Sequence, residues 1–220
     1  MIKSKNRIEI MMIGIVGIIT FISILAYNSK KMTDTLSNEM IRFHVVANSD
    51  TTEDQLLKQQ VKDEIIHYME PLLKDSKSID ETRKIVNMCL PNIKNVSQEV
   101  VKKYGMEYDI YVSLDKANFP TKAYGDVILP AGEYEACRVI IGEGKGENWW
   151  CVMYPPLCYI DIASGVVPLE GKEQLRQNLN EEQYKLVVQN KEKKYVIRFK
   201  IVDTINSVIC KDNYRKKKSC

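Results

Sequence analysis

The longest apolar stretch of the chain lies near its N-terminus, at residues 11–27. These 17 residues include no charged side chain. Ile8 and Ile10 extend the stretch toward the roughly 20 apolar residues that a helix needs to cross the hydrocarbon core of a bilayer. Basic residues flank both ends, and those before it favour a cytoplasmic N-terminus. The pattern predicts a signal peptide or a retained membrane anchor over residues 1–27. It leaves cleavage open, because no typical small-residue cleavage site follows.

After this stretch, a polar segment precedes the first pattern of a folded domain. Residues 28–39 have few apolar side chains, which is typical of a linker. Residues 40–48 have the pattern of a buried strand, with Ile41, Phe43 and Val45 on one face. The other face of this strand would present Arg42, His44 and Val46. We therefore expect an exported domain to begin at residue 40, after a linker over residues 28–39.

Helical patterns follow the first strand. Residues 50–53 and 78–81 resemble capping boxes, and each is followed by apolar residues at helical spacing. Pro91 is expected to end or kink the second of these helices. A third helical stretch then runs to Gly105, a residue that suits a helix C-terminus.

The pattern changes to a period of two from residue 106 onward, which indicates strands. Strands are predicted at residues 106–113, 121–129, 133–141, 149–154, 157–162 and 195–202, with a helix at residues 172–180. The order of one strand, several helices and then many strands predicts an α+β fold. We expect a mostly antiparallel sheet with helices packed on one side. This single exported domain would occupy residues 40–210, before a basic tail at residues 211–220.

Charge and composition exclude one class of partner. The chain is 45% hydrophobic and 28% charged, which is ordinary for a globular protein. Its net charge is +3, and three basic residues and one acidic residue lie within the first 27, so the remainder has a net charge of +1. Binding to nucleic acid requires a concentrated basic face. A nearly neutral domain therefore argues against nucleic acid as the main partner.

Two cysteines near one another in the sequence form a candidate disulfide. Cys151 and Cys158 are separated by a segment that contains Pro155 and Pro156. If the chain reverses near Tyr154, the cysteines become cross-strand neighbours, with Cβ atoms about 4.5–5.5 Å apart. That spacing is close to what a disulfide needs, and oxidation is allowed outside the cytoplasm. The alternative is a pair of reduced core cysteines.

Aromatic and polar side chains give two candidate contact groups. Trp149 and Trp150 are adjacent, so in a strand they point to opposite faces, and tryptophan is frequent at interface hot spots. With Tyr154 they form the first candidate group, although both tryptophans can instead pack inside the domain. The second group lies along and just after the first strand: Arg42, His44, Asn48 and Asp50. Its local alternative is a helix cap formed by Asn48 or Asp50, with Arg42 paired to a nearby acid.

No complete catalytic or metal-binding pattern appears in the sequence. Gly142, Gly144 and Gly146 indicate a hairpin turn, because a phosphate-binding loop would continue into a helix after Gly-Lys-Ser/Thr. The chain has two histidines, which are too few for a usual zinc site without other ligands. We therefore expect no metal, no cofactor and no small-molecule substrate. The alternative class is an exported cysteine-dependent hydrolase that uses Cys151 and His44.

Two stretches of the chain resemble a known family. They are residues 41–50, Ile-Arg-Phe-His-Val-Val-Ala-Asn-Ser-Asp, and residues 129–161, which include Asn-Trp-Trp-Cys and Pro-Pro-Leu-Cys. Both are similar to stage II sporulation protein R of endospore-forming bacteria. The resemblance covers about residues 8–202, including the N-terminal apolar stretch.

The resemblance implies a signalling role rather than an enzymatic one. A protein of this family is made in the forespore and exported into the space between the two membranes of the sporangium. There it triggers a membrane-embedded aspartic protease, which cleaves the inactive precursor of the transcription factor sigma-E. The resemblance supplies no map of contact residues. The candidate groups above therefore remain predictions from their chemistry.

Overall fold

The computed structural model describes residues 2–159, 167 and 169–188. The helices are α1 (Ile2–Ser37), α2 (Thr52–Leu73), α3 (Ile79–Lys103), the short 3-10 helix η1 (Leu157–Tyr159), α4 (Leu169–Asn178) and α5 (Glu181–Val187). The strands are β1 (Ile41–Val46), β2 (Ile110–Phe119), β3 (Lys122–Tyr124), β4 (Val127–Leu129), β5 (Gly132–Ile141) and β6 (Asn148–Tyr154). The strand expected at residues 195–202, the tail at 211–220, Cys210 and Cys220 lie outside the described residues.

One four-stranded sheet organises the fold, in the order β2-β5-β1-β6. The pair β1 and β5 is parallel, whereas β1 pairs with β6 and β2 pairs with β5 in antiparallel directions. Strands β3 and β4 form a separate antiparallel ribbon. The predicted α+β class and mostly antiparallel sheet therefore agree with the structure. The one parallel pair follows from β1, which precedes the helices and enters the sheet between two later strands.

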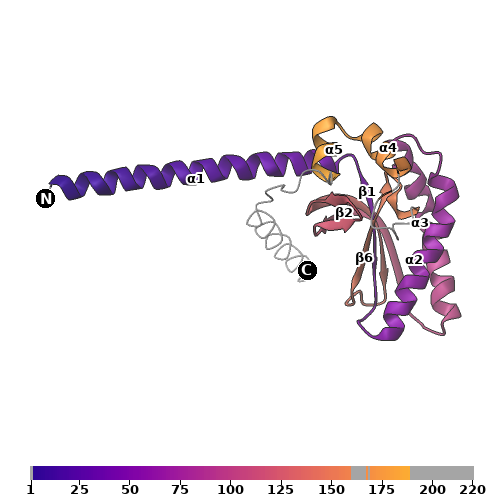
Figure 1. The fold of residues 1–220 in the computed structure, drawn as a ribbon. Helices are drawn as coiled ribbons and strands as arrows, with labels where there is room; N and C mark the ends of the chain where they lie inside the picture. Colours follow the sequence, from indigo (N-terminus) through magenta and orange to yellow (C-terminus); the bar gives the residue numbers. More distant parts are fainter. Residues whose placement is uncertain (1, 160–166, 168, 189–220) are drawn as a thin grey trace.

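Helices α2 and α3 cover one face of the sheet (Figure 1). Each begins at a side-chain cap, because Thr51 and Ser78 accept hydrogen bonds from the backbone N–H groups of Asp54 and Glu81. Their buried residues pack against Phe43 and the alternate apolar positions of β5. We call this side the helical face.

Pro91 does not end the helix as one expected outcome had it, because α3 continues through Pro91 to Lys103. Proline removes one backbone donor and leaves the carbonyl four residues earlier, at Asn87, without its helical partner. Asn87 and Pro91 are both exposed, so water can satisfy that carbonyl. The second and third predicted helical stretches are therefore one helix.

The opposite face of the sheet is covered as well, which corrects the expectation of helices on one side only. A second apolar cluster gathers there from the end of α1, the β3–β4 ribbon, α4 and α5. Strand β1 contributes to both sides, since all six of its residues are buried. We call this side the ribbon face. Its cover is assembled from separate segments that lie far apart in the chain.

The segment expected to be a linker is helical as far as Ser37. Leu36 and Met40 are fully buried in the ribbon-face cluster, so the end of α1 is attached to the domain. Figure 1 shows the rest of α1 extending away from the sheet. Apolar side chains from Met12 to Leu25 are exposed along this extension. Among the described residues, no helix meets the length and apolarity required to span a membrane.

A glycine turn closes the β5–β6 connection against the loop after β1. Gly142 and Gly144 have positive φ angles of 56° and 59°, which favour glycine. At Gly146, an added Cβ would overlap the backbone carbonyl of Ser49. The backbone of the turn also donates from Gly146 to the carbonyl of Ala47, at 3.0 Å. The turn therefore requires the close backbone approach that glycine permits.

This approach predicts that Gly146→Ala destabilises the domain by about 2 kcal/mol, because rigid backbone must move to accept the methyl group. Urea unfolding followed by circular dichroism measures the change. Gly14→Ala is the matched control, since nothing lies within 4 Å of a Cβ at that position. Equal unfolding midpoints for the two variants would contradict the close approach.

Candidate partner-binding site

Arg42 of β1 is a fully buried cation on the ribbon face. Its Nε donates to the carbonyl of Cys151 (2.9 Å), and its Nη2 donates to the hydroxyl of Tyr124 (2.8 Å). The guanidinium carbon lies 4.3 Å from the ring centroid of Phe119 and 4.9 Å from that of Tyr134. Such contacts partly replace hydration through the negative faces of the rings. Within the described part of the chain, no carboxylate forms an ion pair with Arg42.

His44 lies two residues further along the same face. Its ring stacks on Trp150, with centroids 3.8 Å apart and planes 10° from parallel. Its Nε2–H donates to Oδ1 of Asn148 (2.6 Å), which leaves Nδ1 as the lone-pair nitrogen of the neutral ring. Burial, with a smaller contribution from the nearby positive charges of Arg138 and Arg42, lowers the pKa of His44 to about 4. His44 is therefore neutral at pH 7.

The two tryptophans point to opposite faces of β6, as the strand pattern predicts. Trp149 lies on the helical face, where its ring meets Phe43 edge-on (5.5 Å between centroids) and Lys62 Nζ lies 5.2 Å from its centroid. Trp150 lies on the ribbon face over His44. Both side chains are half-buried. Tyr154 is buried at the end of the strand and belongs to the helical-face cluster.

Asn48 and Asp50 hold the glycine turn in place. The Asn48 side chain accepts from the backbone N–H of Glu143 (2.9 Å) and donates to the carboxylate of Asp54 (2.8 Å). The Asp50 carboxylate accepts from the backbone N–H of Glu147 (2.6 Å). Neither residue caps α2, since Thr51 does so. Both amide atoms of Asn48 and one carboxylate oxygen of Asp50 form these bonds, which gives both residues a structural role at this end of the sheet.

Cys151 and Cys158 form a disulfide, with Cα atoms 5.6 Å apart. The chain reaches Cys158 through a cis peptide bond between Tyr154 and Pro155, and Cys158 then lies in η1 rather than on an opposing strand. The expected hairpin geometry is therefore wrong, although the two sulfurs meet. The bond joins the middle of β6 to the segment that follows this strand.

The proposed Cys151–His44 catalytic pair is not assembled. Cys151 is opposite Phe43 in the register and belongs to the helical-face cluster, whereas His44 is opposite Trp150 on the ribbon face. The sulfur of Cys151 is also bonded to Cys158, so it is not a thiolate. The sheet therefore separates the two groups that such a hydrolase would need together.

The predicted contact residues do not form one patch. The structure brings together Arg42, His44 and Trp150 on the ribbon face, and it places Trp149 and Tyr154 with the helical-face cluster. Arg138 was missed by the sequence analysis, although it is directly opposite His44 and its guanidinium pairs with Asp115 at 3.1 Å. A charged residue between the apolar neighbours Cys137 and Val139 was the available signal. Its neighbours across the sheet depend on register, which the sequence does not provide.

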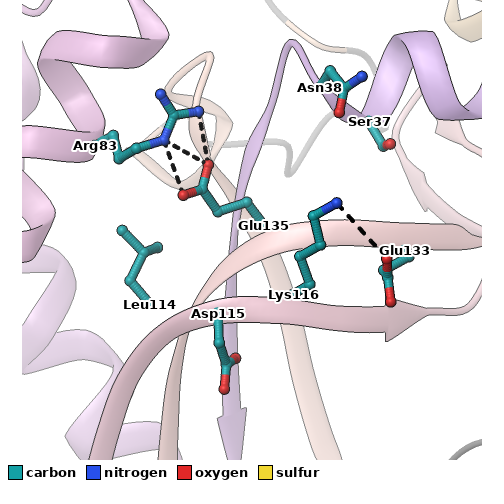
Figure 2. A pocket seen from close by; sticks show the side chains of 8 residues that line it. All are labelled: Ser37, Asn38, Arg83, Leu114, Asp115, Lys116, Glu133 and Glu135. Carbon is teal, nitrogen blue, oxygen red and sulfur yellow. Dashed lines mark hydrogen bonds and ion pairs between the residues drawn. The ribbon is translucent and has the colours of Figure 1, made fainter.

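A hollow of about 410 Å³ opens elsewhere, between the end of α1, the start of α3 and strands β2 and β5 (Figure 2). Arg83 makes a two-pronged contact with Glu135 inside it, with N–O distances of 2.9 Å. Lys116 and Glu133 form a second, looser pair at 3.9 Å. The remaining charged residue of the lining, Asp115, pairs with Arg138 outside the hollow, so every charged lining residue has a partner. None of the predicted contact residues lines this hollow.

Comparison with known proteins assigns the family. Residues 37–164 match the family model described as stage II sporulation protein R. The chain belongs to the stage II sporulation protein R family. Stage II sporulation protein R of Bacillus subtilis (strain 168) is 39% identical over 148 residues, which are 67% of this chain and 66% of that protein. No solved structure matches the chain.

The segment matched to the stage II sporulation protein R family includes the whole four-stranded sheet and both cysteines of the disulfide. It begins at Ser37, where α1 ends. The ribbon-face residues Arg42, His44 and Trp150 therefore lie within the family region. A role in sporulation follows from this membership.

The disulfide is predicted to stabilise the domain by about 2 kcal/mol, because it closes a short loop in the unfolded chain. Urea unfolding with and without a reductant measures this difference in the free energy of unfolding. In the matched control, Cys151→Ser combined with Cys158→Ser, the reductant should have no effect. An unchanged midpoint for the unsubstituted protein after verified reduction would contradict the prediction.

The lowered pKa of His44 predicts that the folded domain becomes less stable as the pH falls. The unfolded chain binds a proton at this residue near pH 6.5, whereas the folded protein does so only near pH 4. Titration of His44 therefore does not reduce the free energy of unfolding above about pH 6.5. As the pH falls from there to 4, on the order of 3 kcal/mol of this free energy is lost. Unfolding in urea at several pH values should show a flatter profile for His44→Phe. The exposed His67, replaced by Gln, should leave the profile unchanged, and equal slopes for all three proteins would refute the assignment.

Proposed function

We propose that this protein is an extracytoplasmic sporulation signal that activates a membrane-embedded aspartic protease. The protease would then cleave the precursor of sigma-E, the mother-cell transcription factor. Membership of the stage II sporulation protein R family is the observation on which the proposal rests. That membership supports a sporulation role directly, and the protease step is the part we add.

Export from the forespore to the intermembrane space is part of this proposal. Its support is the uncharged apolar stretch at residues 11–27, with basic residues on both sides. Apolar side chains of this stretch are exposed from Met12 to Leu25, so the domain does not cover them. A signal peptide and a membrane anchor would each deliver the domain to the same compartment. The protein would then be either secreted or membrane-anchored there.

Activation would occur by a shift in the populations of the protease. A ligand changes a conformational equilibrium only if it binds one state more tightly than the other. The domain would therefore have to contact a surface that differs between the inactive and active protease. A rigid sheet bounded by a disulfide and a fixed turn suits such a role, because little conformational freedom is lost on binding.

A ligand role is also favoured over the cysteine-dependent hydrolase. The only cysteine and histidine proposed for catalysis lie on opposite faces of the sheet. Moreover, Cys151 is held in a disulfide with Cys158. A nucleophilic mechanism would need a free thiolate beside its base.

The decisive experiment is reconstitution in a bacterium that does not sporulate. The protein, the candidate protease and the sigma-E precursor are coexpressed, and precursor cleavage is followed by immunoblot. Cleavage is expected only when all three are present and this protein has its export segment. Removing residues 1–27 confines the domain to the cytoplasm and should abolish cleavage.

Two outcomes would reject the proposal. Cleavage without this protein would show that the protease needs no such ligand, and no cleavage with all three proteins correctly located would show that this protein does not activate it. Cys151→Ser combined with Cys158→Ser addresses the alternative enzyme. A hydrolase that used Cys151 would lose all activity in this variant, whereas a folded ligand would retain it.

A further inference from the structure

Buried polar atoms without hydrogen-bond partners are concentrated at one place in the described part of the chain. Three of the four such atoms in this part are Nη1 of Arg42, Nδ1 of His44 and Nε of Arg138, which come from strands on the ribbon face, and the fourth is Oε1 of Gln174 in α4. Such atoms are uncommon in folded proteins and call for an explanation. The three atoms on the ribbon face come from two neighbouring strands rather than from one irregular loop, which suggests that one feature of the sheet leaves all three atoms without partners.

The sheet register places these residues side by side. Ser113, Arg138, His44 and Trp150 form one row across β2, β5, β1 and β6. Arg42 lies in the next row toward the α1 end of the face. The row on the other side consists of Tyr111, Ile140, Val46 and Asn148. The unpartnered atoms therefore lie next to one another across the middle of the sheet.

The cover of the ribbon face ends at this place. Around Arg42, the residues Phe119 and Tyr134 are almost completely buried. One row beyond His44, Tyr111 is 58% exposed, Asn148 is exposed and Ile140 is half-buried. Figure 1 shows α4 and α5 at one end of the sheet, while α2 and α3 run along its other face. In the rows that contain Arg138 and Tyr111, the inner residues His44 and Val46 are still buried, under Trp150 and the glycine turn, so the surface is open mainly at the outer strands, around Tyr111 and Asn148.

We define the open ribbon face as the part of this surface that remains accessible: Tyr111, Ser113, Arg138, Ile140, Asn148 and Trp150. It combines two large aromatic side chains with an aliphatic one. Aromatic side chains beside arginine are typical of interface hot spots. Tyr111 is the most exposed large side chain of this set.

The charge beneath this surface is not balanced. Arg42 has no carboxylate partner within the described residues, and Arg138 and Asp115 offset each other. Both guanidinium groups act electrostatically on His44, which places them near one another. A buried cation without a counter-ion is costly, and a nearby carboxylate would reduce that cost. Arg42 is too deeply buried for an outside group to touch it, but its positive charge lies beneath the partly exposed Arg138, so a carboxylate bound at Arg138 would also be attracted by Arg42.

We propose that the open ribbon face binds an acidic segment of the protease, with an aspartate or glutamate carboxylate over Arg138 and apolar side chains against Tyr111 and Trp150. This inference rests on the proposed function, since the protease is the partner named there. Arg138 is accessible to such a carboxylate, because its side chain is 21% exposed. The aromatic side chains would supply affinity, and the charge pair would fix the orientation.

Paired substitutions test the surface in the three-protein cleavage assay. Tyr111→Ser and Arg138→Gln should each reduce the initial rate of precursor cleavage about tenfold, the loss expected for a moderate hot spot. The matched controls are Tyr104→Ser, an exposed tyrosine at the end of α3, and Arg176→Gln, an exposed arginine of α4. With either control variant, the precursor should be cleaved at the same rate as with the unsubstituted protein. Thermal unfolding of all four variants checks that the domain remains folded.

Site-specific photo-crosslinking in the full chain identifies the occupant, even if a substitution disturbs folding. A photoreactive phenylalanine analogue at position 111 should crosslink to the protease, and the same group at the exposed Met88 of α3 should not. Crosslinks from position 111 to another part of this chain, or to a second copy of it, would overturn the proposal. The absence of any crosslink, or equal crosslinking from both positions, would also overturn it.

The two proposals fail in different ways. If the unsubstituted protein gives no precursor cleavage, the proposed function fails. If it gives cleavage and Tyr111→Ser and Arg138→Gln match their controls, the protein activates the protease through another surface. In that case the open ribbon face is not the binding site, and the proposed function stands.

Discussion

The burial of β1 on both of its faces is the constraint on which the rest of the structure depends. A strand between two neighbours, with helices on one side and a ribbon on the other, has no position for an exposed polar side chain. Arg42 nevertheless lies there, fully buried. It is tolerated because aromatic rings surround its guanidinium, and because the Cys151 carbonyl and the Tyr124 hydroxyl accept its hydrogen bonds. Those same contacts connect β1 to β6 and to the β3–β4 ribbon.

Two sets of contacts, the hydrogen bonds to the glycine turn and the disulfide, hold the strands in place around Arg42. At one end, Asn48 and Asp50 bind backbone N–H groups of the glycine turn, so the loop after β1 and the β5–β6 connection form one unit. Beyond the other end, the disulfide joins Cys151, in the middle of β6, to Cys158 in η1. Between these points, the side chains on the two faces have few alternative positions. A surface supported in this way can bind a partner with little loss of conformational freedom, which suits a signalling ligand.

The two faces of the sheet differ in composition, and we propose that only the ribbon face binds the partner. The helical face consists of apolar side chains from α2, α3 and the sheet, and it forms a conventional core. The ribbon face instead contains Arg42, His44 and Arg138, and part of it remains open. Polar groups that lack partners reduce stability unless something else satisfies them. Arg42 and His44 are too deeply buried for a partner to reach, whereas Arg138 is partly exposed and lies one row from exposed Tyr111, where we propose that the partner binds.

The sequence by itself determined the features that depend on local periodicity. The faces of β1, the capped starts of α2 and α3, the glycine turn and the opposite directions of Trp149 and Trp150 all follow from spacing along the chain. Only the tertiary structure decided that α3 passes through Pro91, that the end of α1 enters the core, and that a second layer covers the ribbon face. It also decided which of the predicted contact residues meet, because His44 and Trp150 become neighbours through strand register. Register and cover arise from contacts between segments far apart in the chain, and such contacts leave no periodic signal in either segment.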